Sequence, residues 1–354
     1  MRCLIIRLLG TTAILHAEMV ISRAVDFLKF ALAGLFAFSC LPVFSQVAFQ
    51  PQPILKGGEV IPLYPADSPF LDKKRIAEPE LYNTSFDEKP AAIINVIQIH
   101  NPSIEIHLAP DDEKNTGTFI ILAPGGGHKI LWVGHEGGVW VPHFARMGIS
   151  TGILRNRLRS DGYEPTTDAT FDAQQAIRIV RANAEKWRLD PNKIGMMGFS
   201  AGAELAAPAA LDFRKFEEAN CGAGDPLAGV SARPDFIGIL YPGPTPFSRD
   251  PAAQIPRNVP PSFIACSGRT DKIHALWAAD WFHPMLKAGV PNVEMHIFAR
   301  GEHGGQVRGP GEIPYAAWPD RFNEWLADLG LLGKRGEPTR AAKDVEEFVK
   351  EAGR

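Results

Sequence analysis

Cysteine is scarce in this chain. Its 354 residues include only four cysteines, at Cys3, Cys40, Cys221 and Cys266. None of them stands in a CxxC pair or at the cysteine-to-histidine spacing that a zinc site requires. We therefore expect no structural metal ion.

The chain also lacks an excess of charge of either sign. Its 37 Lys and Arg residues nearly balance its 40 Asp and Glu residues, which leaves a formal net charge of -3. No basic run is present that could follow a phosphate backbone, so we expect no nucleic-acid partner. The motifs GxxxxGK(S/T) and HExxH and a dinucleotide-binding fingerprint between strand and helix are missing too, so we expect no cofactor.

Residues 1–45 have the features of a leader peptide. Arg23 and Lys29 precede an apolar run over 30–44, and small residues stand near the end of that run. This pattern is typical of a signal peptide, and Met19 is a possible true start. We therefore expect a secreted or periplasmic protein with no stable membrane span after removal of the leader.

Two alternatives to a cleaved leader stay open at this stage. The apolar run could remain as an uncleaved anchor, or Cys40 could carry a lipid. Removal of the leader would leave Cys221 and Cys266. These two could pair in an oxidising compartment or stay as unpaired small hydrophobic residues.

The remaining chain divides into three parts. Residues 46–90 are rich in proline and turn formers without a clear helix or strand period, and we expect them to wrap the main domain. Over 91–332, short apolar strands alternate with amphipathic helices, which predicts an α/β fold with a mostly parallel central sheet and helices on both faces. Residues 333–354 form a charged tail, predicted to be an exposed helix or a frayed end.

Apolar runs and helical spacing locate the elements of the main domain. A hairpin is predicted over 93–99 and 104–108, split by a turn at Asn101 and Pro102. Further strands are predicted at 118–123, 148–154, 193–197, 236–241, 262–266 and 293–298. Helices are predicted at 168–187, 203–211, 273–287 and 318–329, and Asp168 or Thr170 is expected to cap the first of them.

The segment Gly198-Phe199-Ser200-Ala201-Gly202 matches the GxSxG pattern of a nucleophile elbow. An apolar strand precedes it and a helix of small residues follows, so Ser200 is expected at a sharp turn at the helix N-terminus. Glycine is needed on both sides because a side chain there would collide with the neighbouring strand and helix. The context favours a nucleophilic serine over an ordinary glycine-rich turn.

A nucleophilic serine needs a histidine as base and an acid that orients the histidine, in the chain order Ser, acid, His. Asp271 and His303 follow the predicted strands 262–266 and 293–298, where an open α/β sheet places its ligands. Glu302 could contact the histidine instead, and Asp271 could simply cap the next helix. Of the other histidines, His274 and its helix neighbour His283 are expected to have surface or core roles.

The oxyanion of a tetrahedral intermediate needs backbone N–H donors. One predicted donor is the N–H of Ala201, directly after the nucleophile, and the other comes from the run Gly125 to Gly127 after strand 118–123. Gly126 and Gly127 are the candidates within this run, and the residues alone leave the choice open. A flexible turn is the alternative interpretation of the three glycines.

The sequence resembles the bacterial acetyl-xylan-esterase-like and feruloyl-esterase-like α/β-hydrolases from about Ile93 to Leu332. The likeness rests on Pro124 to Gly127, Arg155 with Leu158, Asp172 to Arg178, Asp190-Pro191, Lys193 to Gly195, Gly198 to Gly202, Asp271 and His303-Gly304. It implies that 91–332 is an α/β-hydrolase catalytic domain. It also implies that the chain deacetylates xylan or related polysaccharides and oligosaccharides by way of an acyl-enzyme.

The resemblance is less specific for the substrate. A feruloyl esterase, a general short-chain carboxylesterase and a non-catalytic binding module are the alternatives. His128 stands where relatives often have tyrosine, and it either contacts substrate or lies exposed in a loop. Trp132, Trp140 and Trp281 could stack on sugar rings or belong to the core.

Overall fold

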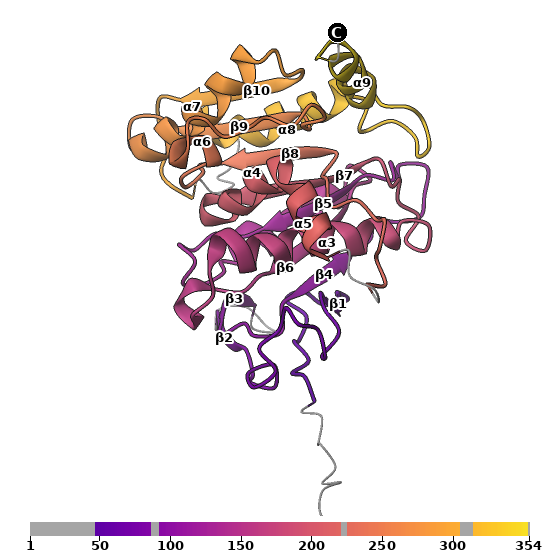
Figure 1. The fold of residues 1–354 in the computed structure, drawn as a ribbon, viewed down its shortest axis with the longest axis vertical. Helices are drawn as coiled ribbons and strands as arrows, with labels where there is room; N and C mark the ends of the chain where they lie inside the picture. The colour runs from indigo at the N-terminus through magenta and orange to yellow at the C-terminus, as the bar shows by residue number, and fades with distance from the viewer. Residues whose placement is uncertain (1–46, 86–91, 221–224, 305–313, 353–354) are drawn as a thin grey trace, which may run out of the picture. The chain divides into compact units, whose positions relative to one another are not determined.

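The structure is a computed structural model that describes residues 47–85, 92–220, 225–304 and 314–352. An eight-stranded sheet runs through it (Figure 1). In order across the sheet, the strands are β1 (Glu59–Pro62), β4 (Ser103–His107), β6 (Ser150–Arg155), β5 (Phe119–Ala123), β7 (Ile194–Phe199), β8 (Phe236–Leu240), β9 (Ser262–Ser267) and β10 (Val293–Phe298). The strands from β6 to β10 in this order are parallel, and β4 and β1 extend the sheet antiparallel.

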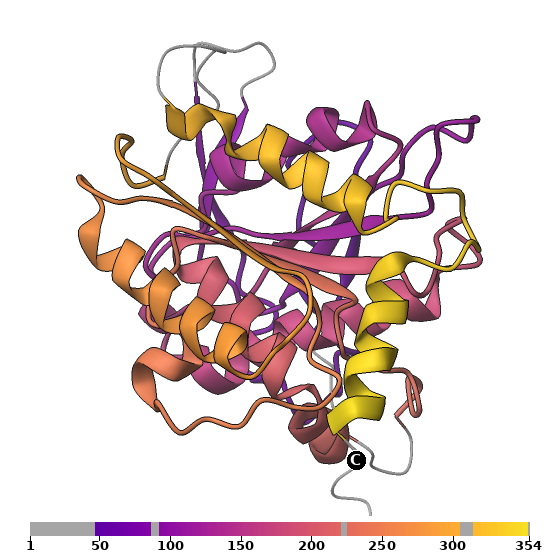
Figure 2. The same ribbon diagram turned by 90° about the horizontal axis from the view of Figure 1, so that it is seen from above.

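Helices cover both faces of this sheet. The α-helices of the described residues are α2 (Trp140–Ala145), α3 (Thr170–Ala182), α4 (Ala203–Leu211), α5 (Phe213–Asn220), α6 (Pro246–Arg249), α7 (Lys272–Lys287), α8 (Trp318–Asp328) and α9 (Arg340–Ala352). Figure 2 shows α7 and α8 on opposite faces of the sheet. The rings of Trp140 in α2 and Trp318 in α8 are 4.8 Å apart, so α2 shares the face of α8. Because both faces are covered, central strands such as Phe119–Ala123 are apolar and buried throughout.

The predicted fold class is confirmed, but the predicted hairpin over 93–99 and 104–108 is wrong. β3 (Ile93–Ile97) pairs with β2 (Leu81–Thr84) in a separate two-stranded sheet, whereas β4 pairs with β1 and β6. Other segments fix the connection between β3 and β4. Asp161 Oδ2 accepts the N–H of Ile99, and Asn101 donates to the carbonyl of Phe49. Distant partners therefore separate two strands that are adjacent in the sequence.

The segment 46–90 has more regular structure than its sequence suggests. Within its described part, β1 adds an edge strand to the main sheet and β2 pairs with β3. Both strands contain four residues, too few to show a periodic pattern. The expected leader, 1–45, lies outside the described residues. None of the helices in the described part of the chain is long and apolar enough to cross a membrane.

The start of α3 also differs from the expectation. A single π-helical turn, Pro165–Ala169, comes before it, and the side chain of Glu164 caps that turn by accepting the N–H of Thr166. Neither expected residue caps α3. Asp168 pairs with Arg157, and Thr170 donates its hydroxyl to the carbonyl of Pro165. Three shorter 3-10 turns cover Arg159–Asp161, Ser200–Gly202 and Pro314–Ala317, and a π turn covers Gly134–Gly138.

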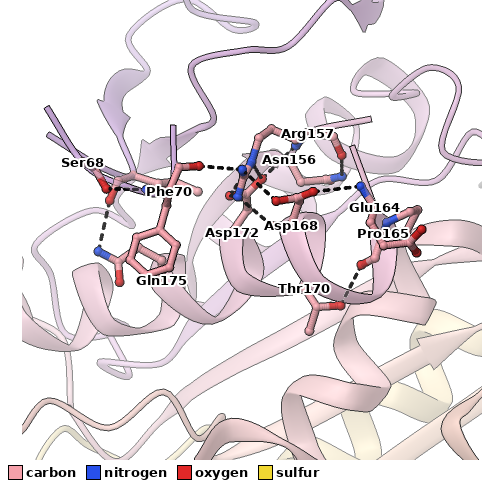
Figure 3. A network of polar contacts seen from close by, with 11 residues as sticks. Ser68, Phe70, Asn156, Arg157, Glu164, Pro165, Asp168, Thr170, Asp172 and Gln175 are labelled. Atoms are coloured by element: carbon pink, nitrogen blue, oxygen red, sulfur yellow. Dashed lines mark hydrogen bonds and ion pairs between the residues drawn. The ribbon is translucent and has the colours of Figure 1, made fainter. Parts of the chain in front are cut away.

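A buried arginine joins the loop after β6 to α3 (Figure 3). The Nε and Nη2 of Arg157 donate to the carboxylate of Asp172, and its Nη1 donates to the carbonyl of Phe70 and to Asp168. Asp172 is fully buried. One guanidinium thus ties together three segments that are distant in the sequence.

The charged tail is more firmly attached than a frayed end. Ala341 and Val345 of α9 are buried. The ammonium of the buried Lys193 donates to the carbonyls of Gly333 and Lys334, at 3.0 and 2.8 Å. The expectation of an exposed segment therefore holds only for the outer face of α9.

Candidate active site

A strained turn presents Ser200 at the carboxyl end of β7. The φ of Ser200 is +51°, a left-handed conformation that is uncommon for residues other than glycine. A Cβ on Gly198 would lie 2.3 Å from the carbonyl oxygen of Gly202, and one on Gly202 would lie 1.9 Å from that of Ala123. Both flanking positions therefore require glycine, as the GxSxG pattern indicates.

Hydrogen bonds connect Ser200, His303 and Asp271 in one chain. Ser200 Oγ lies 2.9 Å from His303 Nε2, and His303 Nδ1 lies 2.8 Å from Asp271 Oδ2. A carboxylate can only accept, so the proton of neutral His303 belongs on Nδ1. Nε2 is then free to accept the serine hydroxyl. The structure thus brings the three predicted residues together in the arrangement that a nucleophilic serine needs.

Two roles are expected for Asp271, the acid that orients His303 and the cap of the next helix, and its surroundings bear on both. It is the residue before α7, but its side chain makes no capping hydrogen bond to the helix. The carboxylate is 5% exposed and faces His303, whereas Glu302 is exposed on the surface. The side chain of Asp271 therefore bonds His303 and does not cap the helix, although the residue stands at the N-cap position.

A second imidazole, His274, shares the carboxylate of Asp271. His274 Nδ1 lies 2.5 Å from Asp271 Oδ1, and the rings of His274 and His303 are 4.0 Å apart. Burial, followed by the proximity of His303, lowers the pKa of His274. His274 was expected to have a surface or core role, although its spacing of three from Asp271 places both residues on one side of the first turn of α7.

The glycine run after β5 packs directly against the nucleophile. A Cβ on Gly125 would lie 2.7 Å from Cβ of Ser200. The N–H of Gly125 donates to Glu136 Oε2 at 2.6 Å, so Gly125 is not a free donor. In the described part of the chain, no hydrogen bond uses the N–H of Gly126 or Gly127. These two residues have φ values of +131° and +64°, which favour glycine.

Glu136 is a buried carboxylate that links the glycine run to the histidine. Its Oε1 accepts the hydroxyl of Tyr241 at 2.9 Å, and the ring of Tyr241 stands edge-on to His303 at 5.1 Å. Burial raises the pKa of Glu136. Glu136 was not predicted from the sequence, because no motif marks a residue whose partners are a loop N–H and a distant tyrosine.

A cavity of about 620 Å³ opens over this arrangement. It is lined by Gly126, Gly127, Trp132, His135, Glu136, Ser200, His274, His303 and Gly304. The side chain of His303 is 41% exposed, so solvent and small molecules reach the base. Another cavity, of about 490 Å³, lies beside α9 and contains none of the predicted site residues.

The remaining candidate residues differ in their exposure and in whether they line the cavity. Trp132 is 37% exposed and lines the cavity, whereas Trp140 and Trp281 are buried in the core. His128 is only 4% exposed, so the alternative of an exposed loop residue is wrong. Its Nε2 lies 3.4 Å from Glu204 Oε1 in the first turn of α4, and His128 is not among the residues that line the cavity.

Within the described residues, one group of side chains is close enough to share a metal ion. Asp271, His274 and His303 offer ligand atoms within 4.8 Å of one another. Hydrogen bonds already join all three, and a bound ion would have to displace their protons. Cys266 is a free, buried thiol, and Cys221 lies outside the described residues.

Comparisons with known proteins agree with this architecture. Residues 105–230 match the BD-FAE family model. An acetylxylan esterase of Xylanibacter ruminicola is 37% identical over 133 residues, which are 37% of this chain and 23% of that protein. Endo-1,4-beta-xylanase B of Butyrivibrio fibrisolvens is 30% identical over 151 residues, which are 40% of this chain and 21% of that protein. The matched part of the chain thus spans less than a quarter of the length of either relative.

Solved structures share the fold over most of the chain. An acetyl ester-xyloside bifunctional hydrolase from Caldicellulosiruptor lactoaceticus is 26% identical, with a TM-score of 0.59 over 78% of this chain and 98% of that one. Esterase 2 of Thermogutta terrifontis, phosphorylated by paraoxon, is 20% identical, with a TM-score of 0.56 over 81% and 98%. These matches confirm the α/β-hydrolase fold and the resemblance to acetyl-xylan-esterase-like proteins.

Proposed function

We propose that this α/β-hydrolase-fold chain is a serine esterase that removes acetyl groups from xylan or related polysaccharides and oligosaccharides. The observation that carries the proposal is the hydrogen-bonded chain from Ser200 through His303 to Asp271 beneath an open cavity. A binding module would have no need of a serine in a strained turn that faces a base.

In the first step, Ser200 Oγ attacks the ester carbonyl while His303 Nε2 takes its proton. The resulting oxyanion accepts hydrogen bonds from the N–H of Ala201 and from the glycine run. Gly126 and Gly127 are the donors that fit, because the N–H of Gly125 is already bonded to Glu136. The imidazolium then returns the proton to the departing alcohol, and the acetyl group stays on Ser200.

In the second step, water replaces the alcohol. His303 accepts a proton from the water as it attacks the acetyl-enzyme, and the same N–H groups stabilise the second oxyanion. Collapse returns the proton to Ser200 Oγ and releases acetic acid, which ionises to acetate in water. Asp271 keeps Nδ1 protonated and stabilises the imidazolium in both steps.

The cavity supports a carbohydrate as the alcohol part of the substrate. Trp132 presents a partly exposed ring on which a sugar can stack, and His135 and the carboxyl group of Glu136 stand beside it. The names of similar proteins, an acetylxylan esterase and an acetyl ester-xyloside hydrolase, point the same way.

The proposal includes removal of a leader at about residue 45 and export from the cytoplasm. Its support is the sequence pattern of 1–45, where Arg23 and Lys29 precede an apolar run. N-terminal sequencing of the protein recovered from the medium or periplasm tests this part. An intact leader on a membrane-bound form would contradict cleavage.

A panel of esters tests the substrate. We expect the highest kcat/KM on acetylated xylo-oligosaccharides, with slower turnover of p-nitrophenyl acetate and little of feruloylated arabinoxylan. A preference for the feruloyl ester would mean that the chain is a feruloyl esterase and not an acetyl esterase. Turnover of p-nitrophenyl acetate alone would leave a general short-chain carboxylesterase.

A further inference from the structure

We infer that His274 is a positioning residue of this site, which holds the carboxylate of Asp271 in place for His303. The inference rests on the proposed esterase function, because it concerns the residue that orients the catalytic base. It does not make His274 a base, since its ring bonds Asp271 and not Ser200.

Both oxygens of Asp271 are taken up by imidazoles. Oδ2 accepts from His303 Nδ1 at 2.8 Å, and Oδ1 accepts from His274 Nδ1 at 2.5 Å. Within the described residues, these are the only hydrogen bonds that reach the carboxylate. Since Asp271 is 5% exposed, loss of His274 would leave a buried oxygen without a partner.

The two imidazoles differ in their supports. His303 lies in the loop after β10, and its side chain is 41% exposed. His274 lies in the first turn of α7, where its ring packs edge-on against Trp277 at 5.1 Å and its side chain is 20% exposed. The hydrogen bond to the helix residue therefore fixes the position of the carboxylate, which can impose an orientation on the more exposed His303.

A neutral donor suits this place. During the reaction His303 becomes positively charged, and the ring of His274 is only 4.0 Å away. A permanent cation there would oppose that charge. The charged and titratable groups around His274 are Asp271, His303 and Glu204, and burial together with His303 lowers the pKa of His274. His274 therefore supplies an N–H without adding a positive charge at neutral pH.

A pair of substitutions separates this role from packing. His274→Leu removes the donor, whereas His274→Asn places an amide N–H at the position of Nδ1, because both nitrogens are attached to Cγ. With p-nitrophenyl acetate, we expect His274→Leu to lower kcat about 10- to 100-fold at unchanged KM. His274→Asn should restore kcat to within about threefold of the wild type.

A second readout does not depend on turnover. In the proton NMR spectrum, imidazole N–H groups bonded to a carboxylate give low-field signals. His107 and His296 also bond carboxylates, so we expect each variant to lose one low-field signal of the wild type, that of His274, and to keep the signal of His303. Equal kcat in all three proteins, or a Leu variant as active as the Asn variant, would overturn the positioning role.

The two proposals fail in different ways. A wild-type protein that hydrolyses no ester would refute the proposed function, while the NMR signals would still show whether His274 donates to Asp271. Normal turnover by the wild type, with no low-field signal that disappears on substitution of His274, would refute the inference about His274 and leave the esterase intact.

Discussion

Asp172 and Asp271 are both buried carboxylates, but their hydrogen-bond partners differ. Asp172 is 0% exposed and accepts four hydrogen bonds from Arg157, through its backbone N–H and its guanidinium. Asp271 is 5% exposed and accepts from two imidazoles instead. A guanidinium keeps its protons at any ordinary pH, whereas an imidazole can exchange one.

The sites of Asp172 and Asp271 also differ in their access to solvent. The guanidinium of Arg157 is 3% exposed and joins the loop at Phe70 to α3, so nothing can react there. His303 reaches a cavity of about 620 Å³ and a serine hydroxyl. Burial of a carboxylate therefore does not mark a reactive site. A partner that can exchange a proton, at the edge of a cavity, does.

The largest expected effect is that of Asp271→Asn. The amide offers His303 a donor as readily as an acceptor, which favours the wrong tautomer of the imidazole and withdraws the negative charge that stabilises the imidazolium. We expect kcat to fall about 10⁴-fold with the fold retained. Steady-state kinetics, with circular dichroism to check folding, measure this. Wild-type activity in the variant would remove Asp271 from the proposed mechanism.

Asp172→Asn should have the opposite profile. It removes the fully buried counter-charge of Arg157 and leaves the partly exposed Asp168 beside the guanidinium, so the free energy of unfolding should fall by about 3–5 kcal/mol. The kcat of the folded fraction should not change. Urea denaturation gives the stability, and Asp168→Asn is the matched control. Asp168 meets the same arginine, but its side chain is 36% exposed, so its loss should cost at most about 1 kcal/mol.

A large loss of kcat in folded Asp172→Asn would contradict a purely structural role for Asp172. Equal destabilisation by the Asp168 and Asp172 substitutions would show that burial does not set the strength of the Arg157 cluster.

Glu136 is an intermediate case with the smallest expected effect. It is buried like Asp172, but its hydrogen-bond partners are a backbone N–H and a tyrosine hydroxyl. Burial raises its pKa above the ordinary 4.5, so between 4.5 and the raised value the unfolded chain loses the proton while the folded protein keeps it. The free energy of unfolding therefore falls as pH rises through that window.

Glu136→Gln removes this contribution. The stability of the variant relative to the wild type should rise as pH increases from 4.5 and then level off. Urea denaturation of both proteins over a series of pH values measures the difference. A difference that does not change with pH would mean that Glu136 titrates as an ordinary surface carboxyl.

The sequence predicted the elements whose signals are local. The strands from β5 to β10 came within one or two residues of their bounds. β5 to β9 are buried along their whole length, whereas β10 is only partly buried. Ser200 was found from a pattern of five residues. Asp271 and His303 were found because parallel strands end at one edge of the sheet, so residues far apart in the sequence meet there.

The misses depend on partners that are distant in the sequence. β3 pairs with β2, and Asp161 and Phe49 bind the connection that follows it. Glu136 reaches Tyr241 across 105 residues, and no local pattern encodes such a contact. His274 is different, since Asp-x-x-His at a helix start carries a local signal. That signal becomes meaningful only when the aspartate is known to face a second histidine.

Release of acetate from acetylated xylan by the wild type and by Ser200→Ala tests the central claim most directly. The alanine removes only the nucleophile, so the protein should fold normally. We expect steady release by the wild type and a loss on the order of 10⁴-fold or more in the variant. Undiminished release by a folded Ser200→Ala protein would contradict the proposed mechanism.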